Sequence, residues 1–153
     1  MNFLIIGPQL NTAAVCAPIL RALPDWFGIE EAIRQYETEI DHLPTFLAVT
    51  ETTTAGFLSL KLHNAFSAEL YVMGIVPSAQ RQGMGKALVR EAQFWLRMQG
   101  IDYWQVKTLG ESHPDANYAA TRAFYAAMGF RPLEELKQIW DENNPCLIMV
   151  KRI

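Results

Sequence analysis

The chain has 153 residues, of which 50% are hydrophobic and 19% are charged, and its formal net charge is -3 at pH 7. This length and balance predict one folded domain over residues 1–153 with a substantial apolar core. The acidic net charge argues against nucleic acid or an anionic membrane as a partner that is recognised by charge.

The first residues and the cysteines bear on the location of the protein. No cationic leader precedes the short apolar stretch NFLII, which is predicted to form a strand that ends at Gly7-Pro8. No apolar run approaches the roughly 18 residues of a membrane-spanning helix. Cys16 and Cys146 are isolated and have no metal-ligand spacing, which is typical of a reducing compartment. We therefore expect a cytoplasmic protein without a metal site.

Helical and strand patterns alternate along the chain, and Pro18 predicts that the first helix is broken or starts late. The order favours an α/β fold with a mixed, mostly antiparallel central sheet and helices on both faces. In chain order, the predicted elements are a strand over 2–6, helices over 11–22 and 28–40, strands over 45–50, 55–62 and 68–76, a helix over 83–99, a strand over 102–109, a helix over 117–128, and strands over 130–140 and 146–153.

The stretch PSAQRQGMGKAL, residues 77–88, lies between a predicted strand and a predicted helix. The first N–H groups of a helix lack internal partners, and the helix dipole adds positive potential there. Gly83 and Gly85 would let an anion approach these amides closely, and Arg81 and Lys86 would add charge. The stretch is therefore either an ordinary helix entry or an anion-binding loop. It lacks the G-x-x-x-x-G-K-[ST] pattern and the third glycine of G-x-G-x-x-G, which excludes two well-known phosphate loops.

Two motifs in this order resemble those of the GCN5-related N-acetyltransferase superfamily, whose members transfer acetyl groups from acetyl-CoA to amines. Gln80, Gly83 and Gly85 fit its Q/R-x-x-G-x-G/A loop, directly after a strand that reads YVMGIVP. Residues 124–133, FYAAMGFRPL, fit its second signature, an aromatic pair followed by Gly-Phe and a strand. The order of the predicted elements also follows the family from residue 45 onward.

The resemblance implies that acetyl-CoA is the acyl donor and that the loop amides hold the CoA pyrophosphate. It also implies that the strand over 70–76 pairs with the pantetheine arm, and that the Met73 N–H polarises the thioester carbonyl. Family members often carry Asn where this chain has Tyr118, so the adjacent Asn117 is the candidate for that contact. The implied cofactor-binding residues are Met73, Gly74, Ile75, Val76, Gln80, Arg81, Gln82, Gly83, Met84, Gly85, Lys86 and Asn117.

The resemblance also implies two catalytic residues. Tyr125 would protonate the departing CoA thiolate, and Glu69 would take the proton of the amine through water. Other interpretations stay open: Tyr125 could simply pack beside Phe124, Glu69 could be a surface charge at a strand start, and His63 is a second candidate base.

Neither cysteine has the nearby histidine of an activated nucleophile. Trp26 and Trp140 fall near the loops that flank the acceptor cleft in this family, whereas Trp95 and Trp104 fall on core positions.

The leading hypothesis is an N-acetyltransferase that moves an acetyl group from acetyl-CoA to a primary amine by direct attack in a ternary complex. The amine would belong to a small molecule or a protein, with no nucleic acid or membrane as partner. A homodimer is left open, because dimers are common among similar proteins. The alternatives are a CoA or acyl-CoA sensor without catalysis on the same fold, and an unrelated nucleotide-binding α/β domain.

Overall fold

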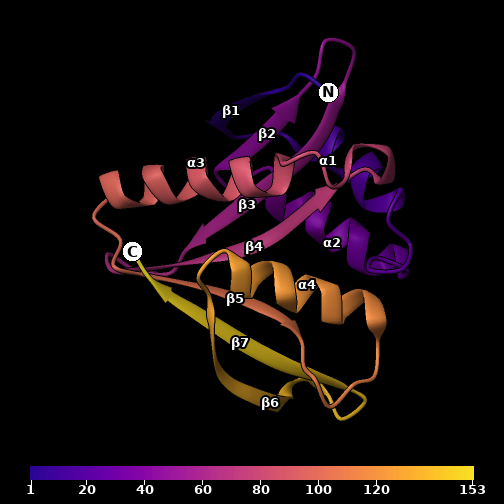
Figure 1. Cartoon of the computed structure of the whole chain (residues 1–153), viewed down its shortest axis with the longest axis vertical. Helices are drawn as coiled ribbons and strands as arrows, with labels where there is room; N and C mark the ends of the chain where they lie inside the picture. Colours follow the sequence, from indigo (N-terminus) through magenta and orange to yellow (C-terminus); the bar gives the residue numbers. More distant parts are fainter.

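One seven-stranded sheet, in the order β1-β2-β3-β4-β5-β7-β6, organises the molecule (Figure 1). The computed structural model describes all of residues 1–153. Neighbouring strands are antiparallel except β4 and β5, which are parallel, so the predicted mixed and mostly antiparallel sheet is confirmed. The strands are β1 (Leu4–Gln9), β2 (Thr45–Val49), β3 (Thr54–Leu62), β4 (Ser67–Ile75), β5 (Tyr103–Leu109), β6 (Arg131–Asp141) and β7 (Asn144–Arg152).

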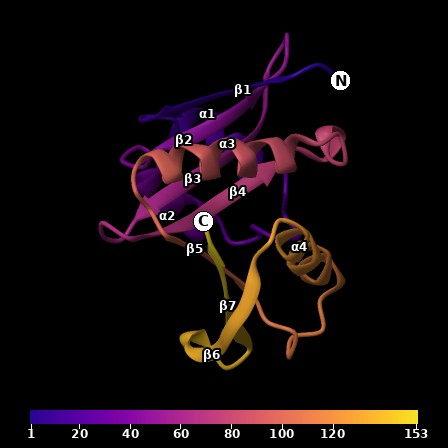
Figure 2. The ribbon, with the colours of Figure 1, turned by 60° about the vertical axis from the view of Figure 1, so that its left-hand side comes forward.

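Helices cover both faces of the sheet, as the sequence predicts. Figures 1 and 2 show α3 on the face opposite to α1 and α2, and α4 beside β5. Residues of β2 alternate between the two cores: Phe46 and Ala48 pack beneath α3, and Leu47 packs beneath α1 and α2. None of the helices combines the length and the apolar character needed to cross a bilayer. The helices are α1 (Ala13–Arg21), α2 (Glu30–Ile40), α3 (Met84–Met98) and α4 (Ala116–Ala127).

The structure decides two local predictions at the N-terminus. Of the two alternatives for the first helix, the late start is confirmed, at Ala13, whereas Pro18 does not break the helix and α1 continues to Arg21. The buried face of α1, which includes Cys16 and Leu20, compensates for the backbone hydrogen bond that Pro18 cannot donate. The predicted end of the first strand at Gly7-Pro8 is wrong, because β1 continues to Gln9 with an irregularity in its pairing with β2.

A β-bulge at Tyr71 redirects β4. Ser59 of β3 pairs with Val72 and Leu60 pairs with Leu70, so Tyr71 is left without a partner in β3. The extra residue shifts the alternation of side chains: Leu70 packs beneath α3, whereas Val72 packs beneath α1 and α2. A bulge also bends its strand and increases its twist, so β4 changes direction at this point.

The strands β4 and β5 pair over only four residues of each strand. The pairs run from Ser67 with Tyr103 to Leu70 with Val106, and they end one residue before the bulge. Beyond this point the two strands diverge, as Figure 1 shows, while β3 stays with β4 and β7 stays with β5. The sheet is therefore split at its centre rather than frayed at an edge.

The helix α4 depends on a side-chain cap at its first turn. Asp115 Oδ1 accepts hydrogen bonds from the backbone N–H groups of Asn117, at 2.8 Å, and Tyr118, at 3.2 Å.

We expect Asp115→Ala to lower the free energy of unfolding by about 1 kcal/mol, because both amides lose their acceptor. Urea denaturation measures this loss, and Asp115→Asn, which keeps an acceptor oxygen, is the control. Equal losses in the two variants would contradict the capping role.

Candidate functional site

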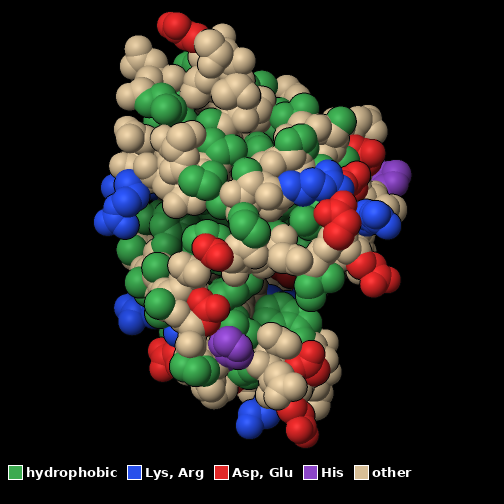
Figure 3. Space-filling view, turned by 90° about the vertical axis from the view of Figure 1, so that its right-hand side faces the viewer, with side chains coloured by type: hydrophobic (Ala, Val, Ile, Leu, Met, Phe, Trp, Pro, Cys, Tyr) green, Lys and Arg blue, Asp and Glu red, His purple; other side chains and the backbone are tan.

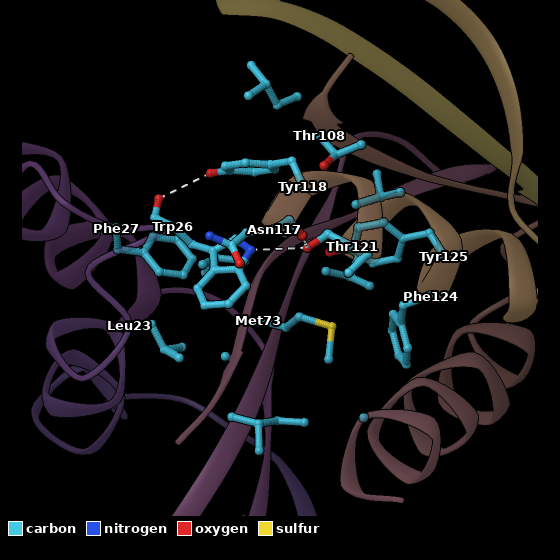
Figure 4. Close-up of a pocket in the computed structure, with 18 of the residues that line it drawn as sticks. Leu23, Trp26, Phe27, Met73, Thr108, Asn117, Tyr118, Thr121, Phe124 and Tyr125 are labelled. Atoms are coloured by element: carbon cyan, nitrogen blue, oxygen red, sulfur yellow. Dashed lines mark hydrogen bonds between the residues drawn. The ribbon is translucent and has the colours of Figure 1, made fainter. Parts of the chain in front are cut away.

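The split between β4 and β5 holds a cavity of about 960 Å³. Its walls come from the diverging strands, the segment between α1 and α2, the first turn of α3, and α4. Figure 4 shows Leu23, Trp26 and Phe27 on one side of this cavity, Phe124 and Tyr125 on the other, and Met73 between them. The cavity thus joins segments that are about a hundred residues apart in sequence.

One end of the cavity is suited to an anion. The backbone N–H groups of residues 81–86 donate no hydrogen bond within the chain, and they lie where the dipole of α3 is positive. Gly83 is the residue before α3 and has φ of 88°, with open space where a Cβ would stand. The side chains of Arg81 and Lys86 line the same end. Free amides and two cations together form a site for a phosphate-like group.

One hydrogen bond joins this loop to the end of β4: Gln80 Nε2 donates to the carbonyl oxygen of Ile75 at 3.0 Å. A Cβ on Gly85 would lie 3.1 Å from ring atoms of Phe124, so glycine lets α3 and the Phe124 ring approach without a shift of the ring.

The backbone of β4 presents polar groups to the split. The Val76 N–H donates to the Ala55 carbonyl oxygen at 2.9 Å, on the β3 side. Because N–H groups alternate in direction along a strand, those of Met73 and Ile75 face away from β3 and toward the split. A ligand that enters the split therefore meets the unpaired edge of β4.

Tyr125 lies on α4 with its ring packed between those of Phe124 and Phe130, at centroid distances of 5.6 and 5.9 Å. The residue is buried and lines the cavity, and its hydroxyl has no hydrogen-bond partner within the chain. Burial raises the pKa of this phenol above its ordinary value, and the charges of Tyr118 and Tyr36 add to the rise. The hydroxyl is thus protonated at neutral pH and free to donate.

Glu69 forms a buried polar cluster beside the cavity. Its Oε1 accepts hydrogen bonds from His63 Nε2, at 2.8 Å, and from Lys107 Nζ, at 3.1 Å. Lys107 lines the cavity and Glu69 does not, so the carboxylate lies behind the lysine. The two candidate bases of the sequence, Glu69 and His63, are therefore hydrogen-bonded to each other.

A hydrogen-bonded bridge joins the segment between α1 and α2 to α4. Trp26 Nε1 donates to Thr121 Oγ1 at 3.1 Å, and the Tyr118 hydroxyl donates to the Trp26 carbonyl oxygen at 3.1 Å (Figure 4). Burial raises the pKa of Tyr118 to about 12, so this hydroxyl keeps its donor proton across the ordinary pH range. The bridge crosses the cavity and encloses it on that side.

The structure brings most of the predicted site residues together around this one cavity. Asn117 lines it beside Tyr118, and Trp26 and Trp140 line it as well. Val76, Gln82 and Glu69 lie outside its lining. The predicted residues that line it are Met73, Gly74, Ile75, Gln80, Arg81, Gly83, Met84, Gly85, Lys86, Asn117 and Tyr125.

The remaining candidates are structural. Trp104 is fully buried in the core beneath α3, and Trp95 is partly buried against the same core. Cys16 and Cys146 are buried free thiols outside the cavity lining, and burial raises the pKa of Cys16 to about 11. Neither thiol has the low pKa or the exposure of a nucleophile. No group of three or more His, Cys, Asp or Glu side chains is arranged to hold a metal ion.

Sequence reasoning missed several residues that line the cavity, among them Tyr36, Tyr71, Lys107 and Thr108. Tyr71 lies on the extra position of the bulge, which the sequence pattern does not reveal. Tyr36 falls on the apolar stripe of α2, where a core position and a cavity position have the same periodicity.

Comparisons with known proteins agree with this architecture. A family model described as an acetyltransferase (GNAT) domain matches residues 41–132. A mycothiol acetyltransferase from Beutenbergia cavernae is 34% identical over 105 residues, which are 66% of this chain and 33% of that protein. The chain thus spans about a third of the length of that relative.

Solved structures share the fold over the whole chain. A GNAT family acetyltransferase from Elizabethkingia anophelis with acetyl-CoA bound has a TM-score of 0.75 at 17% identity, and covers 99% of both chains. A PaiA N-acetyltransferase from Thermoplasma acidophilum in complex with coenzyme A has a TM-score of 0.77 at 19% identity, and covers 100% of both chains. At these identities the likeness concerns the fold.

The bridge between Trp26 and Thr121 can be tested by a double-mutant cycle. Trp26→Phe and Thr121→Val each remove one partner of the hydrogen bond while they keep an apolar side chain. We expect the double variant to lose about 1 kcal/mol less unfolding free energy than the sum of the two single losses, because both single variants break the same hydrogen bond. Additive losses in chemical denaturation would show that the bond contributes nothing to stability.

Proposed function

Because the chain belongs to the GNAT acetyltransferase family, we propose that it transfers an acetyl group from acetyl-CoA to a primary amine. The observation that carries this proposal is the cavity in the split sheet, which connects an anion site on α3 with a protonated phenol on α4. An extended donor with phosphates at one end and a thioester at the other matches this arrangement.

The donor binds along the unpaired edge of β4. The N–H groups of residues 81–86, with that of Gln82 among them, hold the pyrophosphate, and Arg81 and Lys86 are the charge partners. Val76 has no free backbone group for this role, because its N–H donates to Ala55 and its carbonyl oxygen accepts from Ala79. The pantetheine arm takes the place of a neighbouring strand beside Gly74 and Ile75. The backbone N–H of Ile75 and the side chain of Asn117 supply polar contacts to its amides.

The reaction is direct attack on the bound thioester. The amine nitrogen forms a bond to the carbonyl carbon, and the oxygen takes up the negative charge, which the Met73 N–H stabilises. The C–S bond then breaks, and the thiolate takes the proton of the Tyr125 hydroxyl. Tyr125 regains a proton from water, so the products are the acetylated amine and free CoA.

A protonated amine must lose one proton to free its lone pair and a second as the amide forms, and we propose Glu69 as the base that passes both to solvent in turn. Because Glu69 lies outside the cavity lining, each proton reaches it through water that passes Lys107. Its hydrogen bond to the partly exposed His63 offers a route from the carboxylate to solvent. A cytoplasmic location belongs to the same proposal and is supported by the two free thiols.

Release of free thiol from acetyl-CoA in the presence of an amine tests the activity, and calorimetric titration with CoA tests donor binding separately. Amine-dependent thiol release is the expected result. Binding of CoA without thiol release from a broad amine panel would instead identify a sensor on this fold.

Tyr125→Phe isolates the general acid. We expect kcat to fall by about 100-fold, since a positioned proton donor typically contributes at least that much, while the affinity for acetyl-CoA is nearly unchanged. The raised pKa keeps the wild-type phenol protonated as pH rises to 10, so kcat should show no loss from this group below pH 10. An unchanged kcat in Tyr125→Phe would remove Tyr125 from the acid role.

Gly83→Ala tests the anion site, and Gly100→Ala is a matched control. Gly83 and Gly100 have φ of 88° and 83°, and both have open space around the missing Cβ. We expect each variant to lose about 1–2 kcal/mol of unfolding free energy from backbone strain, but only Gly83→Ala to weaken CoA binding. Equal CoA affinities in the two variants would contradict the assignment of the loop.

A further inference from the structure

Aromatic rings line the part of the cavity that the segment between α1 and α2 encloses, apart from the anion site at residues 81–86. We call this part the aromatic end, and define it by Trp26, Phe27, Tyr36, Tyr71 and Tyr118. We propose that the acceptor is a small monoamine with an apolar body of aromatic size, which lies in the aromatic end with its amine toward Tyr125. This inference rests on the proposed acetyl transfer and names the class of amine.

The rings of the aromatic end already pack against one another. Phe27 and Tyr36 meet edge to face with centroids 5.8 Å apart, and Tyr36 and Tyr71 meet at 5.5 Å. Leu23 and Ile29 extend this apolar wall. Figure 3 shows the molecule hollowed at mid-height on one face, with hydrophobic side chains exposed in the hollow. An apolar ring would continue the same edge-to-face packing.

The charges in the lining disfavour an acceptor with several ammonium groups. Asp141 is the single acidic residue of the lining, and its Oδ1 already accepts hydrogen bonds from the Asn143 and Asn144 N–H groups in the β6–β7 turn. Lys107 also lines the cavity, and its ammonium group is paired with Glu69. A polyamine or an aminoglycoside would therefore find one carboxylate in the lining, that of Asp141, for its several ammonium groups.

The Tyr125 hydroxyl sets the orientation of the acceptor. It has no hydrogen-bond partner in the chain, and Tyr125 lines the cavity. Thr108 Oγ1 also lacks a partner, but this atom is shielded from solvent and offers the amine no contact. Figure 4 places Tyr125 on one side of the cavity and Phe27 on the opposite side. The amine thus points toward the reaction centre and the body points into the aromatic end.

The bridge through Trp26 favours a small molecule over a polypeptide. The hydrogen bonds of Trp26 to Thr121 and Tyr118 cross the cavity beside the aromatic end. A peptide that enters from this side would have to break both bonds to continue past its first residue. A compact amine can occupy the aromatic end with the bridge intact.

A panel of acceptors tests the inference by thiol release: 2-phenylethylamine, spermidine, kanamycin, and a hexapeptide with an N-terminal leucine. We expect kcat/KM for 2-phenylethylamine to exceed that for each of the other three by at least tenfold. Preference for spermidine, kanamycin or the peptide would overturn the inference and leave acetyl transfer standing. If no amine releases thiol, acetyl transfer fails, and titration of the same compounds into CoA-saturated protein decides the inference by affinity.

Two variants locate the acceptor. Phe27→Ala removes one ring of the aromatic end, so we expect a kcat/KM for 2-phenylethylamine about tenfold lower. Tyr71→Ala should raise the KM for this amine at least fivefold, whereas Phe94→Ala, which removes an exposed ring on α3, should leave it unchanged. Wild-type kinetics in both Phe27→Ala and Tyr71→Ala would overturn the assignment.

Discussion

The site depends on the separation of β4 from β5 within a continuous sheet. Backbone N–H and C=O groups in a sheet normally satisfy each other, so a strand with an open edge at the centre of a domain is costly unless a ligand or water pairs with it. The bulge at Tyr71 creates this situation, because it bends β4 immediately after its last pair with β5. The outer strands keep their partners, so the cost is confined to the few residues that face the cavity.

The other parts of the site follow directly in the chain from the two strands that separate. The loop before α3 follows directly from the end of β4, so its free amides lie at one end of the opening. The helix α4 follows the end of β5 and carries Tyr125 to the opposite wall. Divergence of two strands thus sets both the spacing and the direction of the groups that would act on a thioester.

Local sequence patterns were sufficient to predict the order of the elements and to select the loop at residues 81–86 and Tyr125, which line the cavity or lie beside it. The strand YVMGIV, the glycines at 83 and 85, and FYAAMGF each carry their signal within ten residues. Pro18 left a break and a late start open, and the choice between them depends on tertiary packing, because the buried face of α1 outweighs one lost hydrogen bond. Tyr71, the contact of Glu69 with His63 and Lys107, and the bridge from Trp26 to α4 depend on register and on long-range contacts, which no short pattern contains.

The close approach of Gly85 to Phe124 couples two segments that lie 39 positions apart in the sequence. A side chain at position 85 would need the ring at position 124 to shift or to be replaced by a smaller one. The two positions are therefore expected to covary among related chains, with glycine opposite a large ring and alanine opposite a smaller side chain. Such covariation would mark how the first turn of α3 and the helix α4 have changed together during evolution.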